Sequence, residues 1–199
     1  IRNSGDFSCY YPGKNGDVYF KKRGEKIFID LERSNRCSVF GIPLSLEING
    51  KGEIQTKISN LGFDFAEKFG IRTSRVGNSF IDIQEHELCK PLEEEIDGEM
   101  VQLEFIFRNY LTGSLKKMYD DGIDLYGLNL PDEMKEADTV REKLPEVISK
   151  LEDLFGAFTK HCENHGIVMV DTKFEVFINS NGDWVLGDEV FTPESSSLF

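Results

Sequence analysis

The sequence has few of the features that mark disulfide-bonded, zinc-binding or membrane-spanning proteins. Its four cysteines are scattered without a Cys-x-x-Cys pair, a usage typical of reduced thiols in the cytoplasm. Among its three histidines, His161 and His165 lack the His-Glu-x-x-His order of a zinc protease helix. No apolar run in the sequence approaches the ~20 residues of a membrane-spanning helix. We therefore expect a cytoplasmic protein without disulfides.

Basic residues are also scarce. The 199-residue chain has 23 Lys and Arg against 36 Asp and Glu, which gives a formal net charge of −13. Nonspecific binding to nucleic acids or anionic membranes needs a basic surface, so this charge argues against both partners. Hydrophobic residues make up 39% of the chain, enough to bury a core. We expect a folded protein without nucleic-acid or membrane partners, and a homo-oligomer is left open.

The order of strand and helix patterns predicts an α+β fold with two lobes. Strands are expected at 17–20 and 26–31, joined by a polar turn. A helix is expected over 58–69, ended by Gly70, and a second from about Pro145 to His165. The expected core-facing stripe of the first helix is Ile58, Leu61, Phe65 and Phe69. That of the second helix is Val147, Leu151, Leu154, Phe155, Phe158 and Cys162.

Two apolar runs near the end of the chain, 167–170 and 184–186, flank an Asn-Gly turn and predict a hairpin. Because side chains alternate along a strand, Asp171, Lys173 and Glu175 should share one face. Glu175 and Asp188 can then meet across the hairpin. Two carboxylates beside a lysine suit a magnesium–nucleotide site. The alternative is a hairpin with a charged solvent-facing side.

Two further segments suit phosphate groups. The loop that contains Gly13, Lys14 and Gly16 lets backbone N–H groups approach a phosphate closely, although it lacks the P-loop pattern and an ordinary turn is the alternative. Arg108 precedes a helix start at Thr112 to Ser114, where an anion is favoured. Arg108 could clamp a phosphate or pair with nearby acidic residues. No His-Arg-Asp or Asp-Phe-Gly motif is present, which disfavours a protein kinase.

Taken in order, these segments resemble the motifs of the SAICAR synthetase (phosphoribosylaminoimidazole-succinocarboxamide synthase) family. The early motifs match at Gly13 to Tyr19, Ser34 to Gly41 and Gly50 to Glu53. The later ones match at Glu104, Arg108, Gly113, Ser114, Asp171, Lys173, Glu175, Asp188, Glu189, Pro193 and Ser196. The resemblance covers nearly the whole chain, and the ordered set is specific although each motif alone is modest.

The resemblance implies an ATP-dependent carboxylate–amine ligase of purine biosynthesis. Such an enzyme forms SAICAR from carboxyaminoimidazole ribonucleotide and aspartate through an acyl phosphate. It also implies an antiparallel N-terminal nucleotide-binding lobe at 1–92, a mixed α/β C-terminal lobe at 93–199, and an ATP cleft between the lobes.

The resemblance further assigns roles to individual residues, with ATP and Mg²⁺ as cofactors. The nucleotide would contact Gly13, Lys14, Val18, Lys90 and Lys173. Mg²⁺ would be held by Glu175 and Asp188. The substrate would be bound by Arg108, Ser114 and Ser38, and the catalytic residues would be Lys173 and Arg108.

The chain departs from the family pattern mainly on the acceptor side. Asn35 and Gly41 stand where the family has aspartates, Ser197 stands where it has an arginine, and Gly16 replaces a basic residue. The segment after Asp138 lacks a long loop of the family, and the C-terminal helices are absent after Phe199. Either the given chain lacks these segments, or it is a shortened, divergent member whose acceptor specificity has changed. The departures leave two alternatives to SAICAR formation: a paralogue ligase with another acid or amine, and a non-catalytic nucleotide-binding protein.

Overall fold

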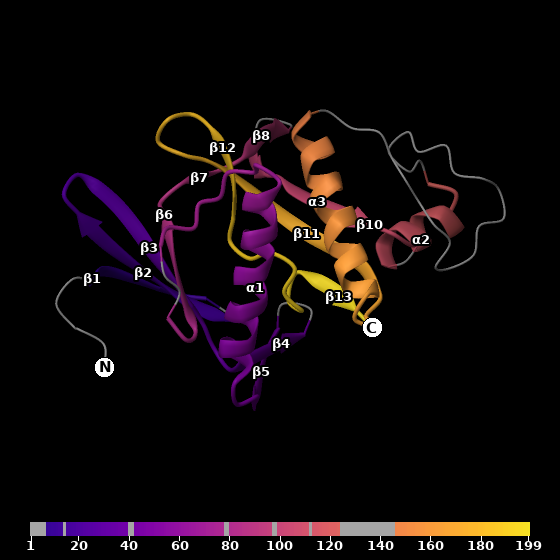
Figure 1. Cartoon of the computed structure of the whole chain (residues 1–199), viewed down its shortest axis with the longest axis horizontal. Helices are drawn as coiled ribbons and strands as arrows, with labels where there is room; N and C mark the ends of the chain where they lie inside the picture. Colours follow the sequence, from indigo (N-terminus) through magenta and orange to yellow (C-terminus); the bar gives the residue numbers. More distant parts are fainter. Residues whose placement is uncertain are drawn as a thin grey trace. The chain divides into compact units, whose positions relative to one another are not determined.

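The computed structural model describes residues 7–13, 15–39, 42–77, 80–96, 99–111, 113–123 and 146–199 (Figure 1). The described strands are β1 (Phe7–Pro12), β2 (Gly16–Arg23), β3 (Lys26–Arg33), β4 (Arg36–Val39), β5 (Ile42–Glu47), β6 (Ile83–Glu87), β7 (Lys90–Pro91), β8 (Glu93–Ile96), β9 (Glu99–Gln102), β10 (Glu104–Arg108), β11 (Met169–Ile178), β12 (Trp184–Gly187) and β13 (Ser196–Leu198). The described helices are α1 (Lys51–Lys68), α2 (Gly113–Asp120) and α3 (Glu146–Glu163). This mixture confirms the α+β class.

Contacts group the chain into two compact units. Unit 1 comprises residues 1–104 and 174–192, and unit 2 comprises residues 105–173 and 193–199. These units do not coincide with the lobes 1–92 and 93–199, because the late hairpin groups with the N-terminal part of the chain. As functional divisions, the two lobes stay a prediction.

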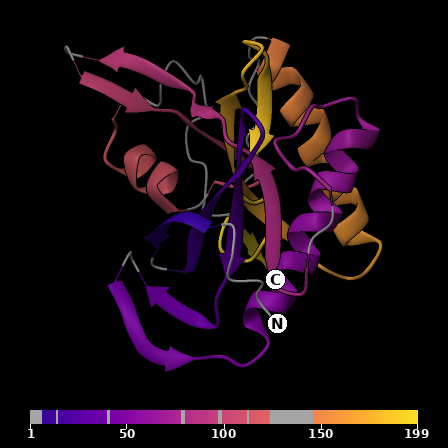
Figure 2. The ribbon, with the colours of Figure 1, turned by 90° about the vertical axis from the view of Figure 1, so that its left-hand side faces the viewer.

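Unit 1 contains an antiparallel sheet in the order β1-β2-β3-β6. The predicted pair of strands at 17–20 and 26–31 is confirmed, with Val18 opposite Leu31. A separate two-stranded ribbon, β4 with β5, is visible in Figure 2. β11 pairs with β12 through residues 175–178 in unit 1 and with β13 through residues 169–172 in unit 2. The predicted late hairpin is therefore present.

Helix α1 begins seven residues earlier than the sequence predicts and buries a different face. It starts at Lys51 rather than 58, directly after Gly50, whose φ of 80° only glycine adopts readily. Leu61 is 38% exposed and Phe69 46% exposed, so the predicted stripe does not face the core. Apart from Phe63, the buried face instead consists of small or polar residues: Gly52, Gln55, Thr56, Ser59, Gly62 and Ala66. The sequence prediction of the stripe was wrong.

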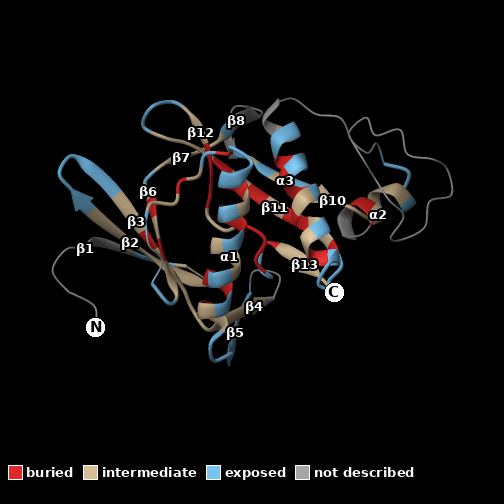
Figure 3. Ribbon diagram, in the orientation of Figure 1, coloured by how far each residue is buried: buried red, intermediate tan, exposed pale blue. Residues whose placement is uncertain are grey.

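Helix α3 packs as its sequence predicts. Leu151, Leu154, Phe155, Phe158 and Cys162 are all buried, and Figure 3 shows buried positions on one side of the helix. No described helix has the length and apolarity needed to span a bilayer. Cys37, Cys89 and Cys162 are free thiols, and burial together with the charge of Glu87 raises the pKa of Cys89 to about 11.

Candidate nucleotide and metal site

β11 carries three charged side chains on one face. Its burial alternates residue by residue along the middle of the strand, and the buried positions are Thr172, Phe174 and Val176. The residues between them, Asp171, Lys173 and Glu175, are half-buried on the opposite face. The alternation predicted from the sequence is confirmed. Asp171 and Lys173 belong to unit 2, whereas Glu175 belongs to unit 1.

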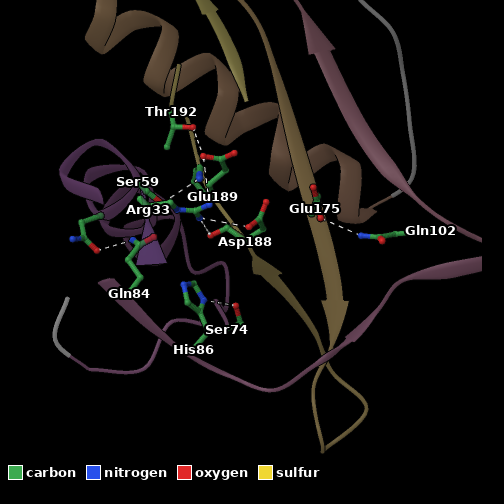
Figure 4. Close-up of polar contacts among 12 residues, drawn as sticks. Arg33, Ser59, Ser74, Gln84, His86, Gln102, Glu175, Asp188, Glu189 and Thr192 are labelled. Carbon is green, nitrogen blue, oxygen red and sulfur yellow. Dashed lines mark hydrogen bonds and ion pairs between the residues drawn. The ribbon is translucent and has the colours of Figure 1, made fainter. Parts of the chain in front are cut away.

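The register of the hairpin places Asp188 next to the residue that faces Glu175. Glu175 pairs with Gly187 across β11 and β12, and Asp188 follows Gly187 directly (Figure 4). A Cβ atom at position 187 would lie 2.6 Å from the Phe177 ring and 2.9 Å from Ser74 Oγ. Glycine is therefore required at this position, because any side chain would separate the two strands.

Residues 188–192, here called the acidic turn, have an unusual backbone. Asp188 and Phe191 have positive φ values of 54° and 59°. Such conformations of non-glycine residues cost on the order of 1–3 kcal/mol each and persist only where the surroundings impose them. One such restraint comes from helix α1, where Ser59 Oγ accepts a hydrogen bond of 3.4 Å from the backbone N–H of Val190. The strain locates this turn as a candidate functional segment.

Arg33, at the end of β3, contacts the acidic turn in unit 1. Its Nη2 donates to the backbone oxygen of Asp188 at 2.9 Å and lies 3.5 Å from Asp188 Oδ1. Its Nη1 lies 3.9 Å from Glu189 Oε2, an oxygen that also accepts a hydrogen bond from Thr192 Oγ1. Arg33 is not among the site residues predicted from the sequence, because the matching motif begins one residue later at Ser34. A basic residue that ends a predicted strand was the available signal.

A buried polar layer lies behind this turn in unit 1. His86 Nδ1 lies 2.9 Å from Ser74 Oγ, and Gln84 donates to Asn60 Oδ1 at 2.9 Å (Figure 4). Burial, reinforced by the charges of Arg33 and Arg75, lowers the pKa of His86 to about 3. His86 is therefore neutral at physiological pH.

β11 and the acidic turn contribute side chains of the type that binds magnesium. Glu175 and Asp188 supply carboxylate oxygens, and Gln102 Nε2 donates to Glu175 Oε2 at 3.1 Å, which orients one carboxylate. Within the described residues, no group of three or more His, Cys, Asp or Glu could hold a metal. Mg²⁺ does not require such a cage, since it takes one or two carboxylates and completes its shell with phosphate oxygens and water. A role for both carboxylates as metal ligands stays a prediction.

The glycine loop of unit 1 is tied to the segment after β3. Gly13 N donates to Gly16 O at 2.8 Å, and Ser38 Oγ donates to Asn15 Oδ1 at 2.9 Å. Ser38, predicted to bind substrate, thus supports the loop in this structure. Val18 is half-buried on β2, and Lys90 is exposed on β7. Lys14 lies outside the described residues.

In unit 2, Arg108 lies beside an acidic residue. Arg108 Nε is 3.8 Å from Asp171 Oδ2, and Asp171 Oδ1 accepts a hydrogen bond of 3.2 Å from the Ser197 backbone N–H. Both interpretations of Arg108, phosphate clamp and ion-pair partner, remain compatible with this distance. Ser114 is the second residue of α2. Lys173 is anchored through its backbone N–H, which donates to Ser195 O at 2.7 Å.

The sequence pattern of SAICAR synthetase matches residues 9–155 and 139–199. The chain belongs to the SAICAR synthetase family. Phosphoribosylaminoimidazole-succinocarboxamide synthase of Desulfosudis oleivorans is 30% identical over 94% of this chain and 74% of its own length. That of Haemophilus influenzae strain PittGG is 31% identical over 95% of this chain and 76% of its own length. Members of this family are ligases that form a carbon–nitrogen bond in purine biosynthesis.

Solved structures of the family share the fold. A SAICAR synthase aligns with a TM-score of 0.78 at 22% identity, covering all of this chain and 78% of its own. The Saccharomyces cerevisiae enzyme, solved in complex with SAICAR, gives 0.76 at 21% identity with the same coverage. A SAICAR synthetase in complex with ADP gives 0.70 at 22% identity, covering 96% of this chain and 84% of its own. The predicted SAICAR synthetase-like fold is confirmed.

Two departures from the SAICAR synthetase pattern have structural explanations in this chain. Asn35 Oδ1 accepts a hydrogen bond of 3.3 Å from Gly52 N in the first turn of α1, which an aspartate oxygen could also accept. At Gly16, a Cβ atom would lie 2.1 Å from Glu32 O, so the local backbone leaves no room for a basic side chain. Gly41 lies outside the described residues. The fold therefore accommodates both departures.

Proposed function

We propose that this protein is an ATP-dependent ligase that forms SAICAR from carboxyaminoimidazole ribonucleotide and aspartate. The observation that carries the proposal is the register that sets Asp188 beside Gly187, opposite Glu175, on an acidic turn under backbone strain. Two carboxylates held in this way suit the Mg²⁺ of a nucleotide. We further infer a cytoplasmic enzyme whose partners are small molecules.

In this proposal, the residues of the chain bind, orient and neutralise charge. Glu175 and Asp188 would hold Mg²⁺, which supplies charge neutralisation at the transferred phosphoryl group. Lys14, Lys90 and Lys173 would neutralise the phosphate oxygens of ATP, while Gly13 admits the phosphates and Val18 contacts the nucleotide. Neutralisation at the transferred group is the largest catalytic contribution expected from the protein.

The acceptor side depends on unit 2 and on Ser38. Arg108 and Ser114 would hold the ribonucleotide so that its carboxylate attacks the γ-phosphate and ADP leaves. The amine of aspartate then attacks the acyl carbon of the resulting acyl phosphate, inorganic phosphate leaves, and the amine proton passes to solvent. Arg108 can hold an oxyanion through two parallel N–H groups, which a lysine cannot do.

An activity assay tests this proposal directly. Purified protein with ATP, Mg²⁺, aspartate and carboxyaminoimidazole ribonucleotide should release ADP and phosphate in equal amounts and form SAICAR. Asp188→Asn should lower kcat/KM on the order of 10²-fold or more, about 3 kcal/mol, while the exposed-helix control Asp153→Asn leaves it unchanged. ATP binding by calorimetry without any ADP release would instead support a non-catalytic nucleotide-binding protein.

A second function, a paralogue ligase with another acceptor, is favoured by position 197. Here a serine whose backbone binds Asp171 replaces the arginine of the family pattern, so one cation is lost on the acceptor side. A screen of imidazole carboxylates with and without a 5′-phosphate, read as ADP release, separates the two functions. Turnover only with carboxyaminoimidazole ribonucleotide rejects the paralogue. Faster turnover with an unphosphorylated acid rejects SAICAR formation as the main reaction.

A further inference from the structure

We propose that Arg33 is a positioning residue for the divalent cation: it fixes the backbone of Asp188, so its removal weakens cation binding. The inference rests on the proposed function, because it concerns the metal carboxylates named there. Arg33 belongs to none of the matched motif positions, and its contacts all lie within unit 1.

The distances show which part of the acidic turn Arg33 holds. Of the contacts that Arg33 makes with this turn, the 2.9 Å bond to the backbone oxygen of Asp188 has normal hydrogen-bond length. The carboxylate oxygens of Asp188 and Glu189 lie farther away, at 3.5 Å and 3.9 Å, which are ion-pair distances. The guanidinium therefore binds the main chain more closely than the carboxylate. The Asp188 carboxylate remains able to bind a cation.

The backbone of Asp188 needs such a restraint. Its φ of 54° lies in the left-handed region, which Asp tolerates better than most residues but occupies less readily than negative φ, so an unrestrained turn would favour negative φ. Relaxation at Asp188 would rotate its carboxylate away from the position set by Gly187 and Glu175. Arg33 restrains this end of the turn, and the bond from Val190 N to Ser59 restrains the middle.

The burial of Arg33 makes the restraint rigid. The side chain is only 12% exposed, and its Nε is buried without a hydrogen-bond partner among the described residues. A buried guanidinium keeps few alternative positions, so the contact to Asp188 O has little freedom to shift. Arg33 thus differs from a mobile surface arginine that screens charge from a distance.

The direction in which cation affinity changes when Arg33 is replaced distinguishes a positioning role from a purely electrostatic one. A positive charge 3.5 Å from a metal carboxylate repels a cation, so on electrostatic grounds alone its removal would tighten cation binding. Positioning predicts the opposite, since the carboxylate would lose its fixed direction. A loss of affinity in a variant that has lost a positive charge therefore has no electrostatic explanation.

The test is a titration of Mn²⁺ by electron paramagnetic resonance in the presence of a non-hydrolysable ATP analogue. We expect Arg33→Met to raise the dissociation constant of Mn²⁺ about tenfold or more and Arg33→Lys to raise it less. The matched control Arg72→Met removes an exposed arginine paired with Asp183 in the same unit and should leave it unchanged. In turnover, Arg33→Met should raise the Mg²⁺ concentration for half-maximal rate, with kcat at saturating Mg²⁺ within about threefold of wild type.

Equal or tighter Mn²⁺ binding by Arg33→Met overturns the inference. If Arg33→Met does not fold, as judged by its thermal unfolding, the decision falls to Arg33→Lys, and wild-type affinity in that variant overturns the inference equally. Failure of the wild-type protein to bind Mn²⁺ with the nucleotide analogue would instead refute the proposed function. The two failures are thus distinguishable in one experiment.

Discussion

Helices α1 and α3 have the same length, 18 residues, but support their units in different ways. α3 buries a stripe of large apolar side chains, including Leu151, Leu154 and Phe158. α1 buries mainly small and polar residues such as Thr56, Ser59 and Gly62, with Phe63 as a large apolar exception. α3 behaves as a packing element, whereas α1 is shaped to receive the acidic turn.

The difference follows from what each helix contacts. Ser59 binds the backbone of Val190, and Gly62 lies so close to Val190 that no side chain fits between them. A polar, strained turn has backbone groups that need partners, and an apolar helix face cannot provide them. A buried helix face that is polar can therefore indicate that the helix binds the backbone of a functional turn. An apolar face indicates only packing.

Truncation of one leucine on each helix should give the largest difference in stability between α1 and α3. Leu154→Ala should lower the free energy of unfolding by about 2–5 kcal/mol, because it removes a fully buried side chain and leaves a cavity. Leu61→Ala on α1, at a position 38% exposed, should lower it by less than about 1 kcal/mol. Urea unfolding of both variants measures this. Equal losses would restore the apolar stripe of α1 predicted from the sequence.

The polar interior of unit 1 should also make stability depend on pH through His86. Its pKa is about 3 in the folded protein against 6.5 when unfolded, so the unfolded state binds the proton more readily. The contribution of neutral His86 to the free energy of unfolding is fully present above pH 6.5. It is lost progressively as the pH falls toward 3. At pH 5 the loss should be about 2 kcal/mol relative to pH 7.5.

Unfolding curves of wild type and His86→Gln at both pH values isolate this effect. The difference in the free energy of unfolding between wild type and the variant should be smaller at pH 5 by the loss given above. The variant has no group to protonate at this position. His165→Gln, at an exposed position after α3, is the matched control and should follow wild type. Parallel pH profiles for wild type and His86→Gln would contradict the prediction.

A glycine in the middle of each helix distinguishes the packing of α1 from that of α3. A Cβ atom at Gly62 would lie 2.6 Å from Val190 O, so Gly62→Ala should destabilise the protein by about 1–2 kcal/mol despite better helix propensity. Gly156 on α3 has open space around it, and Gly156→Ala should stabilise by up to about 1 kcal/mol. Thermal unfolding would show opposite shifts in the melting temperature. Shifts of the same sign would show that α1 can move away from the acidic turn.

The smallest expected effect concerns a single hydrogen bond. Ser59→Ala removes the acceptor for Val190 N, whose 3.4 Å length indicates a weak bond, and should cost about 1 kcal/mol or less. Because the bond restrains the acidic turn, the variant should bind Mn²⁺ with the nucleotide analogue a few-fold more weakly. Ser45→Ala, on the exposed strand β5, serves as the control. Unchanged Mn²⁺ affinity would limit the role of Ser59 to stability.

Much of the fold could be predicted from local patterns. The pairing of β2 with β3, the alternation along β11 and the apolar stripe of α3 all follow from periods that the sequence displays directly. Gly166, at φ 73°, follows α3 as the sequence predicts. Each of these features depends on residues that are neighbours in the chain.

The features that could not be predicted depend on long-range contacts. The buried face of α1 is polar because Ser59 meets Val190, a residue 131 positions away. Arg33 meets Asp188 at a separation of 155 positions, and no local period links them. Hydrophobic periodicity selected Leu61 and Phe69 for the core, since it registers apolar side chains and not the partners that satisfy polar ones.

The hydrogen bond from Gly52 N to Asn35 also has an evolutionary consequence. Asparagine and aspartate codons differ by a single nucleotide, and the side-chain oxygen of either residue can accept this bond. A lineage can therefore exchange a neutral group for a negative one at the start of α1 without unfolding the protein. At position 35, the local charge can therefore change without a loss of stability that selection would remove.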